Sequence, residues 1–74
     1  MKAGIAIDDW KLSIFDRHLS QAGYSYEKGP GVTSDTLFLT VTTDDAAALE
    51  KVVRSANIEA AARKGNHNDQ NHTH

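Results

Sequence analysis

The chain has no cysteine, one proline and one tryptophan among its 74 residues. Without cysteine it can form neither a disulfide nor a thiolate metal site, and both are common means of stabilising so short a chain. A domain of about 60 residues buries only about 60% of its unfolded surface, so the core alone gives modest stability. We therefore expect a second chain to supply stability, and the lack of cysteine is compatible with a reducing cytosol.

The sequence also lacks a long apolar run and a large excess of either charge. The apolar run over residues 3–7 is too short for a signal-peptide core or a membrane span. Eight basic and ten acidic side chains give a formal net charge of −2, so broad attraction to nucleic acid or to an anionic membrane is not indicated. These features favour a cytoplasmic protein that binds neither.

Five segments have the periodicity of regular secondary structure. Alternation of apolar and polar residues predicts strands over residues 2–8, 24–28 and 36–43. A first helix is expected over about 9–22, with Asp8 and Asp9 at its N-cap and Gly23 after its end. A second helix is expected to begin after a cap at Thr43, Asp44 and Asp45 and to end near Lys64. Its apolar stripe consists of Leu49, Val52, Val53, Ala56 and Ala60.

This order of elements matches five of the six elements of a ferredoxin-like domain. We predict an α+β, two-layer β-α-β-β-α sandwich that lacks the fourth strand, with strand order 1-3-2 and both helices on one sheet face. A right-handed crossover is expected to place the first strand parallel to the third. The outer edge of the first strand is then open, which invites pairing with another chain. The domain is expected to span residues 1–65, and the polar tail 66–74 to be disordered.

The first helix carries a candidate interaction surface on the side away from its core face. That core face consists of Leu12, Phe15, Leu19 and Ala22, and the outward side carries Trp10, Lys11, Ile14, Arg17 and His18. An amphipathic ring beside hydrogen-bond donors is typical of protein interfaces and of sites that stack an anionic ring. The alternative is that Trp10 folds over the end of the sheet, and the helical wheel leaves both interpretations open.

The loop between the second and third strands is a candidate phosphate site. Its glycines permit close backbone approach, and its hydroxyls and lysine can donate hydrogen bonds. The loop lacks the Walker spacing and leads into a strand, so an ordinary hairpin loop is the favoured interpretation. The residues concerned are Lys28, Gly29, Gly31, Thr33 and Ser34.

Three aromatic residues, Tyr24, Tyr26 and Phe38, are candidates for a stacking platform on the sheet face away from the helices. The chain has no RNA-binding consensus and little positive charge, so a structural or protein-interface role is favoured.

No enzymatic or metal-binding constellation is evident. The pair of carboxylates at positions 8 and 9 is better explained by helix capping than by a cation site. The tail histidines His67, His72 and His74 lack the spacing of a structural zinc site. No set of nucleophile, base and orienting group can be found, so we expect a non-enzyme with neither cofactor nor metal.

The stretches GIAIDDWKLSIFDRHLSQAGY and TLFLTVTTDDAAALEKVV are similar to a group of short uncharacterised proteins encoded by tailed bacteriophages and prophages. The resemblance covers about residues 3–64 and includes no catalytic signature. It implies expression in the cytoplasm of an infected bacterium, where such proteins often occupy a host protein. Our first hypothesis is thus a homo-oligomeric binding protein that occupies a host protein through the first helix and the sheet edge. The alternative is a small-ligand binder, such as a sponge for a nucleotide signal of antiviral defence.

Overall fold

The computed structural model describes residues 1–72, with the side chains of residues 1–63. The elements are β1 (Lys2–Asp8), a 3-10 turn η1 (Asp9–Lys11), α1 (Leu12–Gln21), β2 (Tyr26–Pro30), β3 (Thr36–Thr42) and α2 (Ala46–His72). The predicted α+β class and the predicted order of strands and helices are therefore confirmed. Among the described residues, no helix combines the length and the apolar character needed to cross a membrane.

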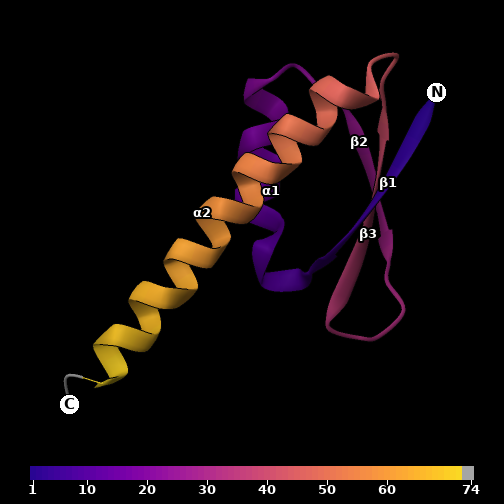
Figure 1. Ribbon diagram of the computed structural model, residues 1–74. Coiled ribbons are helices and arrows are strands. Elements are labelled where there is room, and N and C mark those ends of the chain that lie inside the picture. The colour runs from indigo at the N-terminus through magenta and orange to yellow at the C-terminus, as the bar shows by residue number, and fades with distance from the viewer. Residues whose placement is uncertain (73–74) are drawn as a thin grey trace.

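The three strands form one sheet in the order β1-β3-β2, and the two helices lie on the same side of it (Figure 1). This is the predicted ferredoxin-like arrangement without its fourth strand. Both strand pairs are antiparallel, so the prediction that the first and third strands run parallel is wrong. The crossover through α1 makes β1 parallel to β2, and β3 lies between them and runs opposite to both because a hairpin joins it to β2.

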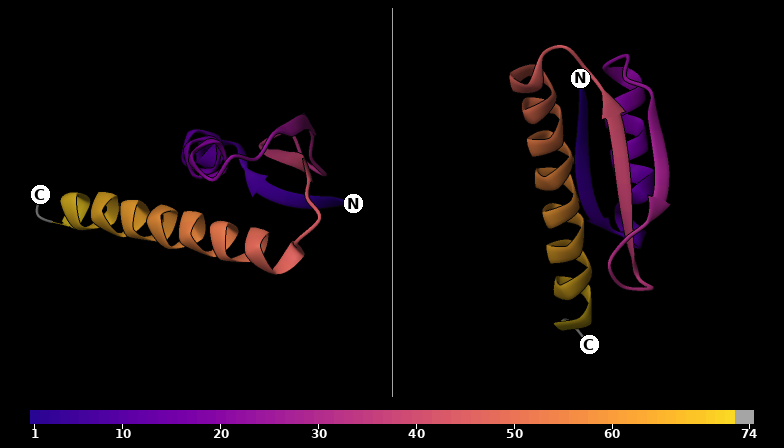
Figure 2. Two further views of the ribbon diagram at one scale, coloured as in Figure 1. Left: turned by 90° about the horizontal axis from the view of Figure 1, so that it is seen from above. Right: turned by 90° about the vertical axis from the view of Figure 1, so that its right-hand side faces the viewer.

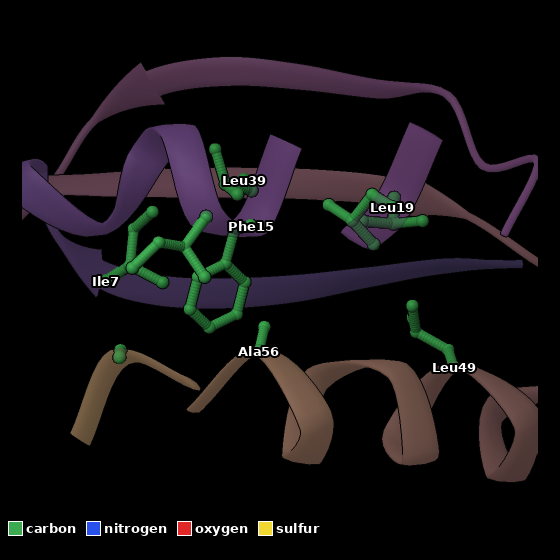
Figure 3. Packing of buried hydrophobic residues seen from close by; sticks show 9 residues of the cluster. Ile7, Phe15, Leu19, Leu39, Leu49 and Ala56 are labelled. Atoms are coloured by element: carbon green, nitrogen blue, oxygen red, sulfur yellow. The ribbon is translucent and has the colours of Figure 1, made fainter. Parts of the chain in front are cut away.

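The core lies between the sheet and the two helices (Figure 3). Ile7, Leu39 and Val41 point into it from the sheet, where Ile5 of β1 is paired with Leu39 of β3. Phe15 contributes the largest fully buried side chain. The predicted apolar faces of β1, β3 and α2 are confirmed. The buried apolar residues are Ile7, Ile14, Phe15, Leu19, Leu39, Val41, Leu49, Ala56 and Ala60.

Two of the four helix ends follow the sequence signals. Gly23 has a φ of 85° after α1, and Tyr24 donates its backbone N–H to the Leu19 carbonyl at 2.9 Å, as expected of a C′ glycine. At the start of α2, the Asp45 carboxylate accepts the Ala48 N–H at 3.1 Å. Asp8 makes no side-chain capping bond at its N-cap position.

Asp8 and Asp9 thus occupy the N-cap and first turn of η1 as predicted, but the side-chain capping bond is absent and the α-helix begins later than predicted. The Asp9 backbone N–H donates to the Asp35 carbonyl at 2.9 Å, so the chain is still tied to the sheet where the helix was expected to begin. The first turn that follows is 3-10, and Lys11 occupies the N-cap of α1 without a side-chain bond.

Two further boundaries differ from the prediction. The second strand was expected at residues 24–28, whereas β2 begins at Tyr26 and includes Pro30. An edge strand tolerates proline where the missing N–H would face solvent. The expected end of α2 near Lys64 is also wrong, because the helix continues through residues 66–72, where the sequence predicts disorder. Glycine at position 65 costs about 1 kcal/mol in a helix interior but blocks no backbone hydrogen bond, and residues 73–74 lie outside the described part.

Candidate interaction surface

Trp10 lies at the protein surface, in the turn η1 that joins β1 to α1. Its side chain is 45% exposed, whereas the core residues are 4% exposed or less. The Lys11 ammonium lies 5.5 Å from the centroid of the indole ring and 3.9 Å from the Asp8 carboxylate. This geometry is a cation–π contact anchored by a carboxylate, and it holds the ring at the end of the sheet.

A hollow of about 160 Å³ lies beside the ring, and we call it the Trp10 hollow. The end of β1 and the turn η1 form one wall, and α2 forms the other through Asn57, Ala60 and Ala61. Small side chains on α2 leave room beside the indole. The hollow therefore combines a large amphipathic ring, apolar walls and polar groups at its rim.

A second hollow, which we call the β1 groove, adjoins the first. It has a volume of about 390 Å³ and lies between β1 and α2. Asn57 lines both hollows, so the two form one continuous surface along the outer side of β1. The residues that line the groove are Ala3, Gly4, Ile5, Ala6, Phe15, Ala46, Leu49, Glu50, Val53 and Asn57.

Ile14 does not belong to this surface, and its assignment as an interface candidate is wrong. The side chain is only 2% exposed and is part of the core. Two features explain the error. A 3-10 turn advances about 120° per residue, whereas the helical wheel assumes about 100°. A wheel that starts at Trp10 therefore assigns the wrong angular positions to the residues of α1. In addition, α1 packs on α2 as well as on the sheet, which widens its buried side.

Arg17 and His18 contact α2 instead of an open surface. Both bind the Glu59 carboxylate, His18 through Nε2 at 2.9 Å and Arg17 through its guanidinium. Arg63 also pairs with Glu59, at 2.9 Å. The hydrogen bond from His18, together with the Arg17 guanidinium, lowers the pKa of Glu59. This cluster joins the two helices, and two guanidinium groups and one imidazole share its single carboxylate.

The three aromatic residues of the predicted platform do not share a face. Tyr26 is paired with Val41, whose side chain points into the core, and its hydroxyl donates to Asp16 of α1 at 2.7 Å. Burial, followed by this bond to Asp16, raises the pKa of Tyr26 to about 12. Tyr24 packs against the core as well. Phe38 alone lies on the open face, so the stacking platform is wrong.

The loop after β2 forms an ordinary hairpin connection, the interpretation favoured by the sequence. The Thr33 hydroxyl donates to the Asp35 carboxylate at 2.6 Å and lowers the pKa of Asp35. The Thr33 N–H donates to the Thr36 hydroxyl at 3.0 Å, and Gly31 donates its N–H to the Thr36 carbonyl at 3.1 Å. The Gly31 and Thr33 groups expected to hold a phosphate are thus already bonded to Thr36 and Asp35. Ser34 is exposed in this loop.

The candidate residues are distributed over separate parts of the molecule. Trp10 and Lys11 lie at the end of β1, Arg17 lies on α1, and Lys28 and Gly29 lie on β2 at the other edge of the sheet. Arg17 and Lys28 do not line the Trp10 hollow. Sequence reasoning missed Asn57, Glu59 and Ala61, because their roles depend on how α2 crosses β1 and α1.

Within the described side chains, no three histidine, aspartate or glutamate residues gather as metal ligands. The side chains of His67, His72 and His74 lie outside that part of the chain. Comparison with family models, with curated proteins and with solved structures finds no match. The function is therefore inferred from the geometry of the Trp10 hollow and the β1 groove.

Proposed function

We propose that this chain is a non-enzymatic binding protein that occupies a partner protein through the Trp10 hollow and the β1 groove. The observation that carries the proposal is the half-exposed Trp10 ring, which is held beside an apolar hollow by its contact with Lys11. Tryptophan is the residue type most enriched at the energetic centres of protein interfaces, where it fills a pocket inside a rim of weaker contacts.

A protein partner agrees better with this surface than a nucleotide does. The Trp10 hollow is smaller than the roughly 300–1,000 Å³ of typical small-molecule sites. The larger β1 groove is lined mostly by apolar side chains, and its one charged lining residue is Glu50. An anionic ligand would need cations there. Of the basic candidates, Lys11 lines the Trp10 hollow but lies 3.9 Å from the Asp8 carboxylate. Arg17 and Lys28 lie elsewhere, on α1 and β2.

The phage-related setting stays a prediction, and in that setting the partner would be a host protein in the bacterial cytoplasm. The homo-oligomer also stays a prediction. Sedimentation of the purified protein at about 100 μM tests it directly, since weak association is detectable near that concentration.

The proposed function is tested by photocrosslinking in the cell that naturally contains the protein. A photoreactive phenylalanine analogue replaces Trp10 in one variant and Val32 in another. Val32 is the control because its side chain is fully exposed in the hairpin loop and lines neither hollow. We expect a discrete crosslinked protein from position 10 that is not crosslinked from position 32. Identical crosslinking patterns from both positions would contradict the proposal.

A further inference from the structure

The outer edge of β1 presents free backbone hydrogen-bonding positions, and its register tells which residues provide them. The Thr43 N–H donates to the Met1 carbonyl at 2.8 Å, and the Asp9 N–H donates to the Asp35 carbonyl at 2.9 Å. Bonded and non-bonded residue pairs alternate along an antiparallel ladder. The odd-numbered residues of β1 therefore bond to β3, and the even-numbered ones, Lys2 to Asp8, direct their N–H and C=O groups outward.

The space beside this edge is where the fourth strand of a ferredoxin-like sheet would lie. Seen from the open face of the sheet, α2 lies beyond β1, on the side away from β3 (Figure 2, right). Seen along the sheet, α2 lies in the helix layer (Figure 1). The helix thus overhangs the position next to β1, with the β1 groove beneath it. An extended backbone in that position would pair with the edge of β1 and pack beneath α2.

The side chains around this position define what the added strand must carry. Ala3, Ile5 and Ile7 face the helix layer, where Leu49 and Val53 of α2 line the groove. Residues of the added strand opposite these three share their face, so they must be apolar. On the open face, Gly4 and Ala6 lie between the charged ends of the strand, Lys2 and Asp8, and the Phe38 ring of β3 covers Gly4.

The two charged residues set the order of charges along an antiparallel added strand, and each lies 3.9 Å from one partner, Lys2 from Glu27 and Asp8 from Lys11. Lys2 and Asp8 lie on the same face, at opposite ends of β1, and their side chains are 66% and 54% exposed. Opposite charges placed directly across two strands stabilise the pairing, and like charges oppose it. In the antiparallel direction, an added segment would begin with a basic residue opposite Asp8 and end, six residues later, with an acidic residue opposite Lys2.

We propose that the edge of β1 binds an extended segment of the partner protein as a fourth, antiparallel strand, with the pattern basic, apolar, polar, apolar, polar, apolar, acidic. This proposal deepens the proposed function and rests on it, since it gives the form of the partner segment. The main-chain bonds supply affinity, and the alternate side chains supply specificity, as in other cases of strand addition.

A second copy of this chain is a poorer occupant of the same edge. Its own β1 carries a matching pattern, from Lys2 to Asp8. However, pairing the two β1 strands into one continuous sheet would bring the second α2 over the edge that the first α2 already overhangs (Figure 2). A segment that carries no helix above it avoids this collision.

The test uses the full-length protein and a soluble synthetic peptide with the core sequence Lys-Val-Thr-Val-Thr-Val-Glu. Nuclear magnetic resonance follows the backbone amides during the titration. We expect saturable shifts at Gly4 and Ala6, whose N–H groups face the edge, and little change at Val32 in the hairpin loop. Exchanging the terminal Lys and Glu of the peptide should weaken binding about tenfold. The double variant Lys2→Glu/Asp8→Lys should reverse this preference.

N-methylated peptides provide the matched control for the main-chain bonds. Methyl groups on the two threonine nitrogens, which face β1, should abolish binding, whereas one on the central valine nitrogen, which faces away, should be tolerated. The proposal is overturned by an absence of saturable shifts at about 1 mM peptide, by equal affinity for both charge orders, or by edge amides already protected through self-association. Photocrosslinking from position 10 is a separate readout, so strand addition can fail while the proposed function survives.

Discussion

Truncation of Leu39 tests the account of the core. The side chain is 0% exposed in the middle of β3, between its neighbours on β1 and β2, and α1 covers it (Figure 3). Leu39→Ala removes three buried carbons, which corresponds to about 2.4 kcal/mol at about 0.8 kcal/mol for each. The cavity left behind raises the expected loss to about 3–5 kcal/mol. A chain of this length has a total stability of about 4–11 kcal/mol, so a large part of it should disappear.

The assay is urea unfolding followed by circular dichroism at low protein concentration, where any association contributes least. Ile58→Ala is the control for truncating an exposed side chain, since Ile58 is 64% exposed, and it should change stability by less than about 0.5 kcal/mol. Trp10→Ala should also leave most of the stability intact. The reasoning is refuted if Leu39→Ala costs less than about 1 kcal/mol, or if Trp10→Ala costs as much as Leu39→Ala.

Four further changes have defined outcomes. Gly23→Ala should lower stability by about 1–2 kcal/mol because of its positive φ, and Gly23→Asn by less, as thermal unfolding can show. Gly4→Ala places a Cβ against the Phe38 ring and should be destabilising, whereas the same change in a Phe38→Ala background should be nearly neutral, which a double-mutant cycle can measure. The folded-state pKa of Glu59 lies below its ordinary value of 4.5, so its stabilising effect is present above about pH 4.5 and is lost as the pH falls through the lower value. The difference in melting temperature between the wild type and Glu59→Gln should therefore be largest near pH 6 and shrink towards pH 3. A chain that ends at residue 65 should keep its melting temperature within about 2 °C, because residues 66–74 include no apolar side chain, and a loss of several degrees would show that this segment stabilises the fold.

Much of the fold could be predicted because each element carries its own periodic signal. The alternation at Ile5 and Ile7 and the run around Leu39 set the strand faces, and Gly23 marked the end of α1. Strand direction was missed for a different reason. The predicted crossover makes β1 parallel to β2, and the predicted hairpin makes β2 antiparallel to β3. The two connections together therefore require β1 and β3 to be antiparallel, which the prediction overlooked.

The candidate site was less predictable, because its residues meet only through tertiary packing. Trp10 was identified from the wheel and is exposed, but Ile14 was misplaced because the wheel assumed a continuous helix through the 3-10 turn. Asn57 joins the two hollows only because α2 crosses the edge of β1. The residue types of such a surface can be identified from the sequence. Which of them lie together depends on how α2 packs against β1.

The most direct test of the proposed function is the affinity of the crosslinked partner for purified variants. Isothermal titration would compare the wild type with Trp10→Ala and Val32→Ala under one set of conditions. We predict that Trp10→Ala weakens binding by about 30-fold or more, as expected of an energetic centre, and that Val32→Ala, at an exposed site outside both hollows, stays within about threefold of the wild type. A dissociation constant for Trp10→Ala within about threefold of the wild-type value would contradict the central claim.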